Sequence, residues 1–209
     1  MAVQRRSRDG RAPRQARVER KTKETRVSVT VALDGVGQAQ VNTGVGMLDH
    51  LIEQIAQHGL FDITLSAEGD LRRDVHHTVE DVGISLGQAL AQALGDKSGI
   101  VRMGHALVPL DEALALVAVD ISGRGYWSLE LPWAGERVGD LPTDLIGHFL
   151  WALASEAGLT LHVRILSGGN DHHKAEAVFK ALGRALAAAT RPEPRLAGRA
   201  ASTKGRLGK

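Results

Sequence analysis

The chain has 209 residues, of which 43% are apolar and only 3% aromatic, and it contains no Cys. This length and composition suit one soluble domain, or two small halves that share a core. The absence of Cys excludes disulfides, iron–sulfur clusters, thiolate zinc sites and Cys nucleophiles, so a bound metal would need His and carboxylate ligands. The sequence offers nine His for that purpose.

Charge is unevenly distributed along the chain. Residues 1–23 carry nine basic and two acidic side chains and residues 191–209 carry six basic and one acidic, while all nine His lie between them. The basic start has no aromatic residue for base stacking and no apolar periodicity. We therefore expect no nucleic-acid partner, and a disordered basic extension over residues 1–20.

The apolar runs are too short to cross a membrane. The longest one, residues 113–119, falls well below the ~20 residues of a transmembrane helix, and no signal-like apolar segment follows the N-terminus. We expect a cytoplasmic protein with no membrane partner.

Apolar spacing predicts alternating strands and helices in the first half of the chain. In chain order these are a strand from about residue 24 to the turn at 34–35, a helix over 47–57, a strand over 61–65 and a helix over 74–94. Asp74 can cap the second helix, and Gly59 and Gly95 end the two helices.

The second half follows the same plan. It predicts a strand over 114–121, a strand over 126–131, a helix over 143–157, a strand over 159–165 and a helix from 172 to about 186. We place the first half-repeat at 21–107, the second at 108–190, and a basic C-terminal tail at 191–209.

The two halves also share a pattern of His and Glu. His50 and His148 each open a stretch of about two helical turns that leads to a Gly and then a strand, and a His-His-x-x-Glu motif begins 26 and 24 residues after them. The motifs are His76-His77-x-x-Glu80 and His172-His173-x-x-Glu176. Their repetition after equivalent strands indicates an internal duplication rather than a polar helix start that arose twice by chance.

On a helix, residues four apart face the same way, whereas adjacent residues point about 100° apart. Each motif can therefore contribute to two metal centres. If the halves pack about a pseudo-twofold axis, one centre would collect His76, Glu80, His148 and His173, and the other His172, Glu176, His50 and His77. Such centres, with open positions for substrate or water, are typical of catalytic sites for a divalent first-row metal.

The remaining histidines, His58, His105 and His162, have no counterpart in the repeat, and we predict ordinary surface or core roles for them.

A weaker indication concerns anion binding. Cationic or hydroxyl-bearing residues lie near the ends of predicted elements: Arg102, Arg124, Lys180, Ser202 and Lys204. The chain has no Walker-type phosphate loop and no GxGxxG after a strand.

From about Arg20 to Leu207 the chain resembles the imidazoleglycerol-phosphate dehydratase family of histidine biosynthesis. The resemblance is carried by residues 43–50, 69–71, 76–81, 95–97, 111–112, 122–124, 170–173, 176–181 and 202–205. The chain departs from the family pattern at Met47, Arg73, Gly169 and Ala201, none of which is a proposed ligand.

The resemblance implies an α/β (α+β) fold in which a duplicated half-domain packs its helices between two mixed β-sheets. It implies self-association into a shell of about 24 subunits built from trimers, with metals at subunit contacts. It also implies two Mn²⁺ per active site, held by His50, His76, His77, Glu80, His148, His172, His173 and Glu176. The residues implied to line the small phosphate-bearing substrate are Glu24, Gln54, Arg102, Arg124, Lys180, Ser202, Thr203 and Lys204.

The reaction implied is loss of water from D-erythro-imidazoleglycerol phosphate to give imidazoleacetol phosphate. Our hypothesis is a di-metal-bound imidazolate that expels the hydroxyl through a diazafulvene-like intermediate. Glu176 is the first candidate for the proton transfer and Glu24 the second. Two alternatives remain open from the residues: a dinuclear metallohydrolase, and a basic-tailed RNA-binding protein.

Overall fold

The computed structural model describes residues 13–207, so most of the predicted N-terminal extension, residues 1–12, lies outside the described part. The first half of the described chain forms one four-stranded sheet and two helices. Its elements are β1 (Gln15–Lys21), β2 (Thr25–Ala32), β3 (Ala39–Asn42), α1 (Gly46–Gly59), β4 (Asp62–Gly69) and α2 (His76–Leu94). The strands lie in the order β1-β2-β4-β3, with β3 parallel to β4 and the other pairs antiparallel.

The second half repeats this arrangement element for element. Its elements are β5 (Met103–Leu110), β6 (Ala113–Asp120), β7 (Tyr126–Glu130), α3 (Thr143–Ala157), β10 (Thr160–Ser167) and α4 (Asp171–Thr190). The sheet order β5-β6-β10-β7, with β7 parallel to β10, matches the first sheet. The short pair β8 (Arg137–Val138) and β9 (Leu141–Pro142) is inserted before α3. The predicted duplication is thus visible in the topology.

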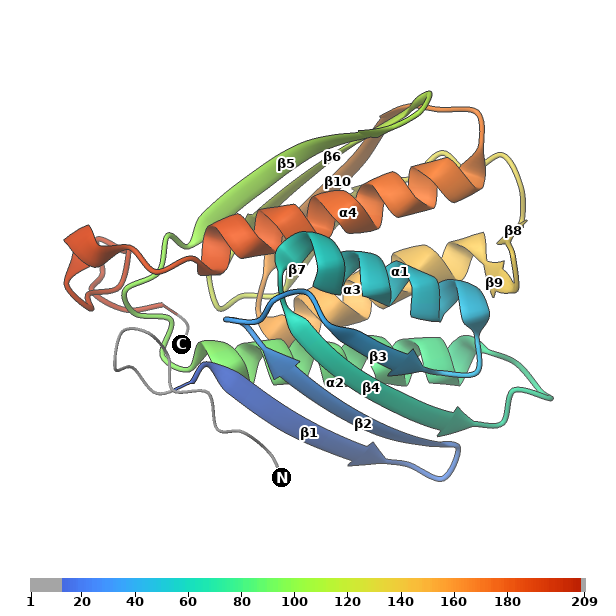
Figure 1. Cartoon of the computed structure of the whole chain (residues 1–209), viewed down its shortest axis with the longest axis horizontal. Coiled ribbons are helices and arrows are strands. Elements are labelled where there is room, and N and C mark those ends of the chain that lie inside the picture. Colours follow the sequence, from blue (N-terminus) through green and yellow to red (C-terminus); the bar gives the residue numbers. More distant parts are fainter. Residues whose placement is uncertain (1–12, 208–209) are drawn as a thin grey trace.

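The four helices form a layer between the two sheets (Figure 1). Alternate residues of β2 and β6 are buried against this layer, as period-2 apolar patterns require. Within the layer α1 packs on α4 and α2 packs on α3, so each helix pair joins the two halves. The predicted fold class is confirmed.

Glycine allows the helices in each pair to approach closely. A Cβ atom at Gly87 of α2 would lie 2.7 Å from the carbonyl oxygen of Leu153 on α3. At the equivalent place in the other pair, a Cβ atom at Gly183 of α4 would lie 2.7 Å from the carbonyl oxygen of Ile55 on α1. Real Cβ atoms do not approach carbonyl oxygens this closely, so the helix packing requires glycine at both positions.

The sequence prediction is wrong for residues 15–20, which belong to strand β1 and not to a disordered extension. Only Val18 of this strand is buried, so the segment shows no apolar alternation. Its order comes from backbone pairing with β2, in the register Val18 to Val29, and from the ion pair of Arg20 with the buried Asp81 of α2. The strands β3 and β5 were not predicted either, and the second half begins at Met103 rather than at residue 108.

The C-terminal tail, up to residue 207, packs on the segment that links the halves. The backbone N–H of Gly99 donates to the carbonyl of Arg199, and that of Val101 donates to the carbonyl of Arg191. Apart from a short 3-10 helix, Pro194–Leu196, the tail is irregular. No helix of residues 13–207 has the length and hydropathy of a membrane span.

Candidate metal centres and a basic pocket

All eight predicted metal ligands lie in the first two turns of the four helices. The four helices begin at the same end of the molecule, on the right in Figure 1. The fold therefore brings residues that are far apart in the sequence to one end of the helical layer.

The first group joins α1 and α4. His50, His172 and Glu176 each offer a ligand atom, and these atoms all lie within 4.8 Å of one another. The Glu176 Oε1 atom is 3.0 Å from His50 Nε2 and 2.9 Å from His172 Nε2.

The second group joins α2 and α3 in the same way. It consists of His76, Glu80 and His148, again with ligand atoms within 4.8 Å of one another. The His148 Nε2 atom lies 3.3 Å from Glu80 Oε1, and the His76 and His148 rings are 4.6 Å apart. Trp127 and Trp151 flank this group in a small pocket.

Two buried nitrogens indicate that these groups suit a metal ion. His50 Nε2 and His148 Nε2, one in each group, have no hydrogen-bond partner among the described residues. Each is near a carboxylate oxygen but lacks the alignment of a hydrogen bond. A buried, unpaired imidazole nitrogen is costly unless it is bound, and a divalent first-row metal satisfies it together with the carboxylate.

The fourth ligand predicted for each centre is not part of its group in this chain. His77 Nδ1 lies 3.4 Å from Glu24 Oε2, and His173 Nδ1 lies 2.8 Å from Glu112 Oε2. Both rings are close to a carboxylate on a neighbouring strand turn. Sequence reasoning did not assign a role to Glu112, although it occupies the same place in the second half as Glu24 in the first.

The carboxylate of Glu176 is strongly stabilised in its ionised form. Burial raises its pKa, but Lys180, His50 and His172 outweigh this effect and lower the pKa to about 2. The Lys180 Nζ atom is 2.6 Å from Glu176 Oε2. Lys180 therefore lies at the first group and not in the pocket that the other basic residues line in this chain. Gln54 is at the same end, where its side chain donates to the carbonyl of His50 at 3.4 Å.

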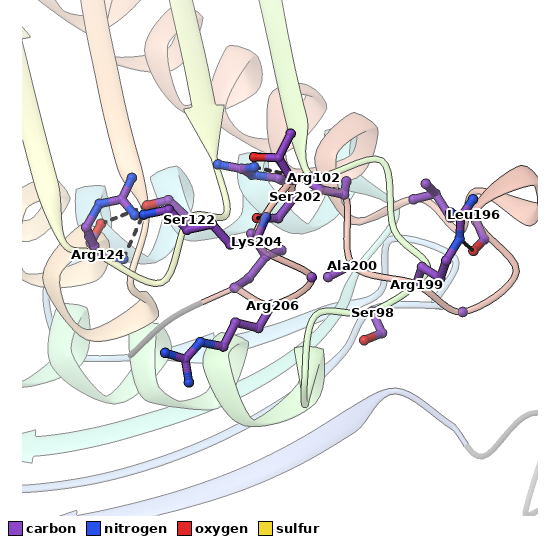
Figure 2. A pocket seen from close by; sticks show the side chains of 15 residues that line it. Ser98, Arg102, Ser122, Arg124, Leu196, Arg199, Ala200, Ser202, Lys204 and Arg206 are labelled. Carbon is purple, nitrogen blue, oxygen red and sulfur yellow. Dashed lines mark hydrogen bonds between the residues drawn. The ribbon is translucent and has the colours of Figure 1, made fainter.

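The other residues predicted for the substrate phosphate gather in a pocket of about 1000 Å³ beneath the C-terminal tail. Figure 2 shows Arg124, Ser202 and Lys204 around it. Thr203 and two tail residues that the sequence analysis did not single out, Arg199 and Arg206, also line it. The only sequence feature that could have indicated Arg199 and Arg206 was the basic composition of the tail.

Arg102 is in the same pocket, but its guanidinium is already engaged. It donates to both carboxylate oxygens of Asp120, at 2.7 and 2.8 Å, and to the carbonyl of Ala201 at 2.8 Å. These bonds anchor the tail and engage Arg102, whereas the side chains of Arg124, Lys204 and Arg206 donate no hydrogen bond among residues 13–207.

The pocket and the metal groups lie at opposite ends of the helices. The backbone N–H of Arg102 donates to the carbonyl of Ala189, near the end of α4, whereas His172 is near the start of that helix. With a rise of 1.5 Å per residue, the two places are about 25 Å apart. One chain therefore does not bring the predicted substrate residues together into a single site.

The remaining histidines lie outside the two groups. His105 and His162 are exposed on their strands, and His58 is half-buried on α1. None of the three belongs to a His–Glu group in the described part of the chain.

Comparison with known proteins shows to which family the chain is similar. The family model for imidazoleglycerol-phosphate dehydratase matches residues 43–186. A protein of that name from Chloroflexus aggregans is 56% identical over 93% of this chain and 95% of its own length, and one from Desulforamulus reducens is 58% identical over 93% and 98%.

The fold of the chain is also similar to solved structures of such enzymes. The enzyme from Pyrococcus furiosus, in complex with (S)-C348, superposes with a TM-score of 0.78 at 37% identity, over 91% of this chain and all of that one. The enzyme from Staphylococcus aureus gives 0.77 at 37% identity, over 85% and 99%. The chain is thus an enzyme of the imidazoleglycerol-phosphate dehydratase family, a family of hydro-lyases.

Proposed function

We propose that the chain removes water from imidazoleglycerol phosphate to give imidazoleacetol phosphate, a step of histidine biosynthesis, in a reaction that depends on Mn²⁺. The observation that carries the metal dependence is the pair of His–Glu groups, each with a buried and unpaired imidazole nitrogen.

The residues that would hold the metal ions are His50, His172 and Glu176 in one group and His76, Glu80 and His148 in the other. Three protein ligands per ion leave coordination positions for the fourth ligand and for substrate. When bound, the ions supply positive charge that stabilises the azole ring of the substrate as it gains electron density.

A complete site requires more than one subunit. The basic pocket and the metal groups of one chain are about 25 Å apart along α4, which is farther than a small phosphate ester can reach. We infer that the pocket of one subunit meets the metal groups of another, with His77 and His173 completing the centres across that contact. This arrangement supports self-association, and the shell of about 24 subunits built from trimers stays our prediction for the assembly.

Within such a site, Arg124, Ser202 and Lys204 would bind the phosphate, and Lys180 would reach it from the metal end. Their charge-assisted hydrogen bonds hold the substrate in one register and so supply orientation.

The proton transfer is better assigned to Glu24 than to Glu176. A carboxylate with a pKa of about 2 is a weak base, so Glu176 suits the role of a ligand. Glu24 is half-exposed in the turn between β1 and β2, beside His77. It would remove the C–H proton next to the carbon that loses its hydroxyl, and the resulting enol would tautomerise to the ketone.

The test is turnover of imidazoleglycerol phosphate by chelator-stripped protein, with and without Mn²⁺, followed by the ketone product. We expect ketone only with Mn²⁺, and the exposed variant His105→Gln should match the unsubstituted protein. Release of inorganic phosphate in place of ketone would favour the metallohydrolase. Binding of RNA by a protein that retains no metal would favour the RNA-binding alternative.

A further inference from the structure

The turn between β5 and β6 holds the start of α4 through the side chain of Glu112. Its Oε1 atom accepts hydrogen bonds from the backbone N–H of Gly169 at 3.2 Å and of Asn170 at 2.8 Å. Its Oε2 atom lies 2.8 Å from His173 Nδ1. The backbone carbonyl of Glu112 also accepts a hydrogen bond from the Ser167 hydroxyl. Glu112 thus contacts both the loop before α4 and the imidazole of His173, the second histidine of the His172-His173 pair.

The first half contains an equivalent carboxylate–imidazole pair, in which the two side chains lie farther apart. Glu24 occupies the turn between β1 and β2, and its Oε2 atom lies 3.4 Å from Nδ1 of His77, the second imidazole of the other doublet. The carboxylate of Glu24 accepts no hydrogen bond from the backbone of residues 13–207. The duplication therefore contains two turn carboxylates on two equivalent rings, but only the one in the second half is fixed by backbone N–H groups.

We propose that Glu112 is a positioning residue that keeps the proton of His173 on Nδ1 and leaves Nε2 free to bind a metal ion. The proposal rests on the function proposed above, in which His173 is a metal ligand. An ionised carboxylate can only accept hydrogen bonds, so the His173 nitrogen that faces it must carry the hydrogen. The lone pair of the neutral ring is then on Nε2, on the side away from Glu112.

The variant Glu112→Gln separates this role from simple support of the loop. The two backbone N–H groups require an acceptor, so the amide oxygen of Gln faces Gly169 and Asn170. The amide NH₂ then faces His173 Nδ1 and donates to it. This contact favours the proton on Nε2, where it blocks metal binding, while the loop keeps both of its hydrogen bonds.

The experiment measures Mn²⁺ affinity and the number of ions bound per chain in the full-length protein, without substrate. Loss of the outer hydrogen bond to a metal-bound His typically weakens binding about 10- to 100-fold, and we expect a loss of this size at one ion per chain in Glu112→Gln. The matched control is Asp111→Asn. The Asp111 carboxylate is 3.9 Å from the same nitrogen, and its backbone has φ +47, a conformation that Asn adopts readily. We expect unchanged Mn²⁺ affinity in this control.

The outcomes separate the alternatives. If the unsubstituted protein binds no Mn²⁺, the proposed function fails and this inference fails with it. If it binds Mn²⁺ and Glu112→Gln binds equally well, while Glu112→Ala binds weakly, Glu112 only supports the loop and the inference alone is overturned. In a His173→Ala background Glu112→Gln should cause no further loss of affinity, and a further loss would overturn the role through His173.

If the variants do not fold, the crystal structure of the Mn²⁺-loaded, unsubstituted protein gives the answer. We expect the ion on His173 Nε2 and the Glu112 carboxylate on Nδ1. An ion bound to Nδ1, or to Glu112 itself, would overturn the proposal.

Discussion

The Glu176 side chain is the most heavily contacted carboxylate of the candidate site, with two imidazoles and the Lys180 ammonium around it. Removing it takes away one of the three ligand side chains of the first group and leaves the Lys180 ammonium without its counter-charge. Loss of a side chain that only hydrogen-bonds to a metal ligand typically lowers metal affinity or activity about 10- to 100-fold. Glu176 is itself a proposed ligand, so Glu176→Ala should lower kcat/KM by more than about 100-fold. The measurement is steady-state turnover with saturating Mn²⁺. Normal activity in this variant would contradict the assignment of Glu176 as a metal ligand.

Lys204 belongs to the opposite end of the chain and should affect binding more than chemistry. A hydrogen bond between charged groups is worth about 1.5–3 kcal/mol, so Lys204→Ala should raise KM by about tenfold or more while kcat changes little. Arg17→Ala, which removes an exposed cation on β1, is the control and should leave both constants unchanged. A fall in kcat at constant KM for Lys204→Ala would contradict a phosphate-binding role.

At the scale of helices, Gly87 and Gly183 mark equivalent contacts in the two helix pairs. Gly183→Ala places a methyl group 2.7 Å from the Ile55 carbonyl oxygen, and overpacking of this kind costs about 1–3 kcal/mol. The matched control is Gly147→Ala on α3, where the new methyl group would meet its nearest neighbours at 3.8 Å. Alanine is the better helix former, so this control should be neutral or stabilising. Thermal unfolding of both variants checks the prediction.

Elements with a strong apolar period could be predicted from the sequence, and those held by pairing alone could not. The helices α2 and α4 each present a continuous buried face, and β2 alternates cleanly. By contrast, β1 buries a single apolar side chain at the edge of its sheet, so its order depends on pairing with β2 and on the long-range ion pair of Arg20 with Asp81.

The candidate site divides in the same way. His76 and Glu80, four residues apart on one helix, could be predicted to share a centre, because their geometry is local. The contact of His173 with Glu112 spans 61 residues and depends on the β5–β6 turn. The distance between Arg102 and the metal groups follows from the length of α4 and the path of the tail, which no local pattern encodes.

At the scale of the whole molecule, a site built between subunits predicts complementation. Glu176→Ala inactivates the metal end of a chain, and Lys204→Ala weakens the pocket end. When the two variants are unfolded together and reassembled, some sites should combine an intact metal end with an intact pocket. With substrate well below the KM of Lys204→Ala, where that variant is slow, we expect activity above that of either variant reassembled alone. Activity equal to the average of the two parents would indicate sites that lie within single chains.

The pairing of α1 with α4 and of α2 with α3 has an evolutionary consequence. Each His–Glu group takes one helix from each half, so a polypeptide with the length of one half would contain no complete group. Two copies of such a polypeptide, related by a twofold axis, would form both groups at once. An ancestor that predates the duplication would therefore have bound metal only as a dimer, and the fusion of its two copies freed each copy to change independently. The loose carboxylate of Glu24 and the fixed carboxylate of Glu112 are the kind of divergence that this freedom permits.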